Sequence, residues 1–65
     1  MYISGSTIRK ILKEAGASRT SSEAVETMQE YVNNVAYGVA QKAVRLSRHA
    51  KRKTVDTSDI KLAIS

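Results

Sequence analysis

Apolar residues recur at helical spacing in three separate stretches of the chain. In the first stretch, residues 8–15, isoleucine, leucine and alanine fall at i, i+3, i+4 and i+7, and charged residues take the positions between them. This pattern is typical of a short amphipathic helix. Ser4 or Ser6 can cap its beginning and Gly16 can end it, so residues 16–20 are predicted to form a loop.

The second stretch is much longer, with apolar side chains at spacings of three and four and no proline. Thr20 and Glu23 have the spacing of a capping box at its beginning, and Ser21 and Ser22 are alternative caps. The pattern predicts one helix over residues 21–49. Its apolar face widens near the middle until more than one side of the helix needs to be covered.

A third helix is predicted after residue 55. Asp56 can cap it, Asp59 occupies the third helical position, and Val55 is placed to pack against Ile60. The apolar face of this helix consists of Ile60, Ala63 and Ile64. We therefore expect an all-α chain that forms one domain over residues 1–65, in the order short helix, long helix, short helix.

The length of the second helix favours a dimer. A helix of about 29 residues is about 43 Å long, whereas a compact domain of this size is about 28 Å across. Two short helices cannot cover the middle of such a helix, so we expect a second copy of the chain to cross it there. The predicted dimer core comprises Met28, Tyr31, Val32, Val35 and Val39.

The composition excludes several kinds of chemistry. The 65 residues include no Cys and one His, so disulfides, thiolate metal sites and the usual zinc sites are not expected. None of the common catalytic or phosphate-binding motifs is present, and we expect neither enzymatic activity nor a cofactor or small-molecule substrate. The beginning of the chain does not resemble a signal peptide and no apolar run could span a membrane, so a soluble, intracellular protein is expected.

The charge is unevenly distributed. Residues 1–19 sum to +3, residues 20–41 to −3 and residues 42–65 to +5. A basic surplus in so small a domain indicates a polyanionic partner, either nucleic acid or an anionic membrane surface. Arg19 and the Lys51–Lys53 cluster, which lie in predicted loops, are the favoured contacts.

Other polar residues are less informative. Lys42, Arg45 and Lys61 are equally compatible with an ordinary solvated surface. Asn33 and Asn34 have side chains that can read DNA bases, but they lie in the acidic stretch, where phosphate is repelled. The acidic stretch and the capped helices also disfavour a membrane-surface role. Binding to the nucleic-acid backbone without sequence preference fits these residues best.

Two segments carry a resemblance to a known family. Residues 48–55, RHAKRKTV, followed by residues 58–63, SDIKLA, are similar to the second loop and third helix of archaeal histones, which are minimal histone folds without tails. Residues 11–19 fit the end of the first helix and the first loop of that family. The resemblance covers essentially the whole chain without a gap, and the RKT loop is its most specific part.

The resemblance implies a histone fold in which two chains form an intertwined head-to-tail dimer. The first loop of one chain then lies beside the second loop of the other, and the loop pairs, with the paired first helices, bind phosphates of bent double-stranded DNA. Arg19 would point to the minor groove. The DNA-binding residues implied in this way are Lys10, Lys13, Arg19, Lys53 and Thr54.

The resemblance also assigns structural roles. Arg52 and Asp59 would form a pair that stabilises the second loop, and Gly16 would allow stacked dimers to approach closely, although a helix cap alone explains that glycine. Tyr37 stands where several relatives have a basic residue, and Lys51 replaces a frequent glycine. The implied contact between dimers comprises Leu46, His49, Asp59 and Leu62. His49 can alternatively be a favourable residue at a helix C-terminus.

These observations predict an architectural protein that homodimerises, binds duplex DNA largely without sequence preference, and wraps or compacts the chromosome. Tetramers or longer stacks on DNA are expected, with the protein located in the cytoplasm on the chromosome or nucleoid. The alternative is a histone-fold interaction subunit that heterodimerises within a transcription-related complex. The fold alone does not separate these two hypotheses.

Overall fold

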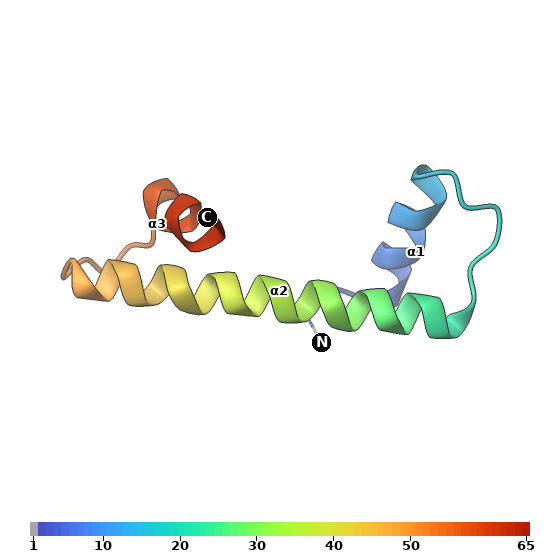
Figure 1. Ribbon diagram of the computed structural model, residues 1–65, viewed down its shortest axis with the longest axis horizontal. Coiled ribbons are helices and arrows are strands. Elements are labelled where there is room, and N and C mark those ends of the chain that lie inside the picture. Colours follow the sequence, from blue (N-terminus) through green and yellow to red (C-terminus); the bar gives the residue numbers. More distant parts are fainter. Residues whose placement is uncertain (1) are drawn as a thin grey trace. The chain divides into compact units, whose positions relative to one another are not determined.

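The computed structural model describes residues 2–65, and its described part consists of three helices without strands. The order is α1 (Gly5–Glu14), α2 (Ser22–His49) and α3 (Thr57–Ile64) (Figure 1). The predicted all-α, short–long–short arrangement is therefore confirmed. The chain divides into two compact units between Asn34 and Val35, within α2. The first unit contains α1 and the second contains α3, each with its own part of α2.

Helix α1 begins and ends where local hydrogen bonding predicts. The Ser4 hydroxyl accepts a hydrogen bond from the Thr7 N–H at 3.3 Å, so Ser4 rather than Ser6 is the N-cap. At the other end, Gly16 has φ 110°, and the N–H groups of Gly16 and Ala17 each donate at 3.0 Å to carbonyls of the last helical turn. This is the Schellman arrangement, which requires a left-handed residue. A side chain at Gly16 would meet no other atom of the chain, so the backbone conformation by itself explains the glycine.

Helix α2 has a different cap from the predicted capping box. The Ala24 N–H donates to the Ser21 hydroxyl at 3.1 Å, so Ser21 is the N-cap of α2. The predicted capping box between Thr20 and Glu23 is therefore not formed. A capping box needs a carboxylate three residues after the cap. With Ser21 as cap, that third residue is Ala24, which has no side-chain acceptor, and the prediction for Thr20 was wrong.

The end of α2 repeats the Schellman arrangement with a lysine in place of glycine. The Lys51 N–H donates to the Arg48 carbonyl at 2.9 Å, and the Arg52 N–H donates to the Ser47 carbonyl at 2.9 Å. Lys51 has φ 58°, the left-handed conformation that glycine adopts most easily, at the position where relatives often have glycine. A side chain there costs about 1 kcal/mol relative to glycine.

Replacing this lysine should stabilise the fold. We expect Lys51→Gly to raise the thermal midpoint by roughly 4–8 °C, because the strain of the left-handed residue is removed. Circular dichroism melts at a fixed protein concentration would measure the change, since the midpoint of an oligomer depends on concentration. Lys53→Gly is the matched control, because Lys53 does not have a positive φ. An equal response of both variants would contradict the strain at Lys51.

In the first unit, the segment before α1 is fastened to α2 by side-chain amides. The Ile3 N–H donates to Asn33 Oδ1 at 2.7 Å, and the Ile3 carbonyl accepts from Gln29 Nε2 at 2.9 Å and from Asn33 Nδ2 at 3.3 Å. Asn33 is only 6% exposed, and Ile8 and Val25 are fully buried nearby in the same unit. Asn33 is thus committed to the fold and cannot read a DNA base.

In the second unit, small residues allow α2 and α3 to pack closely. Ala43 and Ser47 of α2 and Ala63 of α3 are all buried. The Ser47 hydroxyl donates to the Val44 carbonyl at 3.1 Å, so burial leaves it satisfied. Of the predicted apolar face of α3, only Ala63 is buried within the chain, because Ile60 is 37% and Ile64 is 68% exposed.

The predicted dimer core is not buried within a single chain. Tyr31 is 70% exposed and Val35 is 47% exposed, although both lie near the middle of a helix of 28 residues. Met28, Val32 and Val39 are partly buried. A single chain therefore leaves an apolar stripe on α2 that its own helices do not cover.

Candidate nucleic-acid interface

The first loop and the adjoining face of α1 form a basic hollow, which we call the first-loop hollow. It measures about 230 Å³ and lies within the first unit. It is lined by Arg9, Lys13, Ala17, Ser18, Arg19 and Thr20. Two of the predicted DNA-binding residues, Lys13 and Arg19, are thus brought together. Lys10 is exposed on α1 but does not line this hollow.

Helix geometry explains how this hollow gathers its cations. Arg9 and Lys13 are four residues apart in α1, so they lie on the same face, and the loop after Gly16 brings Arg19 to them. Three cations and no carboxylate line the hollow, together with the hydroxyl residues Ser18 and Thr20. Such a set of donors matches the oxygens of phosphate.

Arg9 also lines this hollow, although the predicted DNA-binding residues do not include it. The spacing of four residues from Lys13 was the available signal, since the two side chains share a face of any helix that includes both. The spacing does not predict the path of the first loop, and it is this path that places Arg19 beside the two side chains.

The second loop, residues 50–56, exposes a different basic group. Lys51, Lys53 and Thr54 are all exposed, and the loop connects α2 to α3 in the second unit. Arg52, in the middle of this group, is partly buried instead. The adjacent lysine and arginine therefore have different environments, although their charges are the same.

Arg52 is held by four acceptors within its own loop and α3. Its Nη1 donates to Asp59 Oδ2 at 2.9 Å, and its Nη2 donates to Asp59 Oδ1 at 2.8 Å, which is a bidentate ion pair. Nη1 also contacts Asp56 Oδ2 and the Thr54 carbonyl, each at 3.1 Å. The two residues that the resemblance pairs are thus in direct contact, and the guanidinium fastens the loop to α3.

Asp59 has a second structural role in the cap of α3. Asp59 Oδ2 accepts from the Asp56 N–H at 2.9 Å, while Asp56 Oδ1 accepts from the Asp59 N–H at 3.3 Å. The predicted capping box at Asp56 is therefore confirmed. The Asp59 side chain is only 3% exposed. The Arg52 guanidinium, and then the Asp56 N–H, lower the pKa of Asp59 to about 2, so the carboxylate remains charged at neutral pH.

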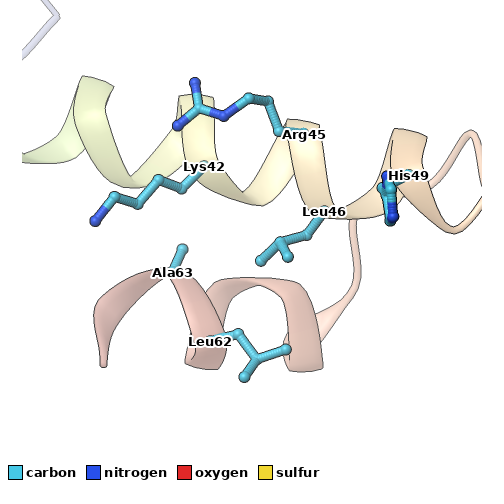
Figure 2. A pocket seen from close by; sticks show the side chains of 6 residues that line it. All are labelled: Lys42, Arg45, Leu46, His49, Leu62 and Ala63. Atoms are coloured by element: carbon cyan, nitrogen blue, oxygen red, sulfur yellow. The ribbon is translucent and has the colours of Figure 1, made fainter.

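A larger hollow lies between α2 and α3 in the second unit, and we call it the α2–α3 hollow. It measures about 470 Å³ and is lined by Lys42, Arg45, Leu46, His49, Leu62 and Ala63. Figure 2 shows Leu46 pointing from α2 into the space between the helices. Leu46, His49 and Leu62 share this hollow, as a contact between dimers would need. Asp59 is not among the residues that line it, and its carboxylate is bound by Arg52.

Two further kinds of feature were sought among the described residues, a cluster of metal-ligating side chains and a membrane-spanning helix. Within residues 2–65, no three His, Asp or Glu side chains lie close enough to hold a metal ion. In the same part of the chain, no helix combines the length and apolar character needed to cross a bilayer.

Known proteins and a family model match most of the chain. The chain is 46% identical over 55 residues to probable archaeal histone 3 of Methanocaldococcus jannaschii, which covers 85% of this chain and 82% of that protein. It is 40% identical over 57 residues to a subunit of the archaeal histone HAN1 of Thermococcus zilligii, which covers 88% of this chain and 85% of that protein. The model of the family described as histone-like transcription factor (CBF/NF-Y) and archaeal histone matches residues 2–64. The chain therefore belongs to this family of archaeal histones and histone-like transcription factors.

Proposed function

We propose that the protein is an architectural DNA-binding protein that acts as a homodimer and wraps or compacts chromosomal DNA. The observation that carries this proposal is the first-loop hollow. Arg9, Lys13 and Arg19 line it together with hydroxyl residues, and no carboxylate lines it. The exposed Lys53 and Thr54 add a second basic surface. Both surfaces have the donors that duplex phosphates require.

The exposed middle of α2 supports the homodimer. A helix of 28 residues is about 42 Å long, and Tyr31 and Val35 leave apolar surface near its centre. If a second copy crosses there, the apolar stripe of each chain covers that of the other, since a twofold contact presents the same surface from each chain. The predicted core residues Met28, Val32 and Val39 are partly buried in the single chain and would become fully buried in the dimer.

A head-to-tail dimer would also join the two basic loops. The first-loop hollow of one chain would lie beside Lys53 and Thr54 of the other, which gives each dimer two such sites. Lys10, which lies outside the hollow, would serve a third site at the paired α1 helices. A dimer carries twice the formal charge of +5 of one chain. This arrangement would form a basic track for successive phosphates.

Recognition should depend little on DNA sequence. Phosphate contacts position a protein on the duplex but do not distinguish bases. Asn33, one of the two amide side chains considered for base reading, is buried and bonded to Ile3. The cations of the first-loop hollow suit phosphates and the narrow minor groove, where arginine reads shape rather than sequence.

Contacts between dimers are a further part of the proposal. Leu46, His49 and Leu62 line the α2–α3 hollow, whose apolar floor a neighbouring dimer can cover. Gly16 leaves open space at the end of α1, which would let a stacked dimer approach. Stacks of this kind on DNA would be tetramers or longer.

DNA binding with increasing salt tests the proposal. If a dimer neutralises about 6 to 10 phosphates, the affinity for a labelled duplex should fall with a log–log salt slope of roughly −5 to −9. Arg19→Ala and Lys53→Ala should each weaken binding by a similar factor on unrelated sequences and reduce the slope. Fluorescence anisotropy measures both quantities.

The control and the alternatives are equally direct. Lys61→Ala removes an exposed cation that lines neither hollow and should change affinity least. A salt-insensitive affinity, or a loss confined to one sequence, would contradict backbone binding. Light scattering of the pure protein separates a stable homodimer from an interaction subunit that needs another chain. A ladder of nuclease-protected lengths would indicate stacked wrapping, and its absence with retained binding would indicate bridging or isolated bending.

A further inference from the structure

Another hollow lies along α2 in the second unit, and we call it the arginine hollow. It measures about 330 Å³ and is lined by Tyr37, Ala40, Gln41, Val44, Arg45 and Arg48. Alanine and valine supply apolar surface, and both arginines are exposed beside it. No residue of α3 lines the hollow, and Figure 2 shows Arg45 pointing away from that helix. The third helix therefore leaves this surface to a partner.

The arginine hollow has no acidic partner within its own unit. Residues 35–65 contain two acidic side chains, Asp56 and Asp59, and both are bound to Arg52. Arg45 and Arg48 form no ion pair with another described residue. The charges of these two arginines are available to another chain.

The first part of α2 carries the complementary charge. Residues 22–34 contain three glutamates and neither lysine nor arginine. Four exposed residues of this part have the spacing i, i+4, i+7 and i+8 of one helical face, which we call the acidic face: Glu23, Thr27, Glu30 and Tyr31. The helix dipole favours acidic residues within the first turn, so it does not explain Glu30. The acidic face thus presents an aromatic side chain with two carboxylates beside it.

The two surfaces match when two copies of α2 pair head to tail. Antiparallel pairing about the midpoint of its 28 residues places Glu23 opposite Arg48. The same register places Glu30 opposite Gln41, whose amide can donate to the carboxylate. Tyr31 then faces the apolar part of the hollow. A twofold contact forms this set of interactions twice.

We infer that the arginine hollow docks the acidic face of a second copy, and that the pair of Glu23 with Arg48 makes the chain select itself. The inference rests on the proposed homodimer and adds what determines the choice and direction of the partner. A histone-fold chain without these glutamates would leave the arginines uncompensated in the contact, which disfavours it. DNA is a weaker occupant, because a phosphate backbone cannot cover the apolar part of the hollow.

Opposite charge reversals in two separate variants test the inference. Glu23→Arg and Arg48→Glu each bring like charges together twice in their own dimers, which should raise the dimer dissociation constant roughly 3- to 30-fold. In a mixed dimer of the two variants, each contact again joins opposite charges. When the variants are refolded together, the mixed dimer should therefore rise from about half, the statistical proportion, to at least about three quarters of all dimers. Native mass spectrometry separates the three dimers by mass.

Glu26→Arg mixed with Lys61→Glu is the matched control, with the same charge changes outside the contact. Glu26 lies five residues from Tyr31, on the other side of the helix, and Lys61 does not line the hollow. These two variants should mix in about the statistical proportion. An equal enrichment in both mixtures would overturn the inference, because it would show attraction by net charge alone.

The remaining outcomes separate the inference from the proposed homodimer. Statistical mixing of Glu23→Arg with Arg48→Glu, with both variants dimeric, would overturn the inference and leave the homodimer intact. A monomeric unaltered protein in sedimentation velocity would overturn both. If neither variant folds alone, recovery of helical circular dichroism on mixing would support the inference, and its absence would overturn it. An Arg48→Glu dimer of unchanged stability that loses as much DNA affinity as Lys53→Ala would show a phosphate site instead.

Discussion

Val35→Asp should leave the isolated protein unfolded near neutral pH. Val35 is 47% exposed in the single chain, but in the proposed dimer it lies where the two long helices cross. An aspartate there would place two unpaired carboxylates, one from each chain, in a buried contact, which costs several kcal/mol. A domain of this size has only a few kcal/mol of stability to lose. The substitution is therefore expected to remove the dimer and the fold together.

Far-UV circular dichroism and sedimentation velocity would check this result. Asn34→Asp is the matched control, because it introduces the same side chain at the adjacent exposed position of α2 and should remain folded. Val35→Ile should also keep the dimer, since it preserves apolar surface. A Val35→Asp protein that stays helical as a monomer would contradict the proposed dimer, because it would show that one chain does not need its partner.

Among substitutions of single charged residues, Asp59→Asn should lower the free energy of unfolding the most. The side chain of Asp59 is 3% exposed and accepts hydrogen bonds from Arg52 and from the Asp56 N–H. An amide cannot accept both guanidinium hydrogen bonds, and Arg52 would lose its principal partner. Removal of one member of a buried pair is costlier than replacement of both. We therefore expect Arg52→Met with Asp59→Asn to be less destabilised than the sum of the two single variants.

The same carboxylate predicts a stability change in acid. The pKa of Asp59 is about 2 in the folded chain, below the value of about 3.9 for an unfolded aspartate. Protonation therefore favours the unfolded chain, so the contribution is complete above about pH 4 and is lost as the pH falls through about 2. Thermal melts between pH 7 and 2 should show this decline in the unaltered protein and a smaller one in Asp59→Asn. Glu26→Gln is the control and should retain the full decline, because Glu26 is exposed and forms no ion pair with another described residue.

The roles of the basic residues in the second loop were only partly predictable from the sequence. The cluster Lys51–Lys53 predicted a basic loop, but charge alone did not distinguish its members. The resemblance to histones paired Arg52 with Asp59, and the structure places the two in contact across seven residues. Lys53 remains exposed beside it. Arg52 and Lys53 differ in exposure because α3 places the Asp59 carboxylate beside Arg52, and the packing of α3 sets that placement.

The helix ends were largely predictable from sequence because capping is local. Ser4, Asp56 and Gly16 act through hydrogen bonds to residues a few positions away, so their spacing indicates their role. The exception was the beginning of α2, where several hydroxyl residues compete and backbone geometry selects Ser21 over Thr20. Competing caps differ little in propensity, so their order along the chain does not decide among them.

By itself, the sequence determined the helix order, the excess of apolar surface on the long helix and the basic character of the loops, because each follows from local spacing or composition. Only the tertiary structure decided which polar side chains remain free. It buried Asn33 against Ile3 thirty residues away and gathered Arg9 with Arg19. These outcomes depend on contacts between distant segments, whose geometry is set by packing rather than by the period of any one helix.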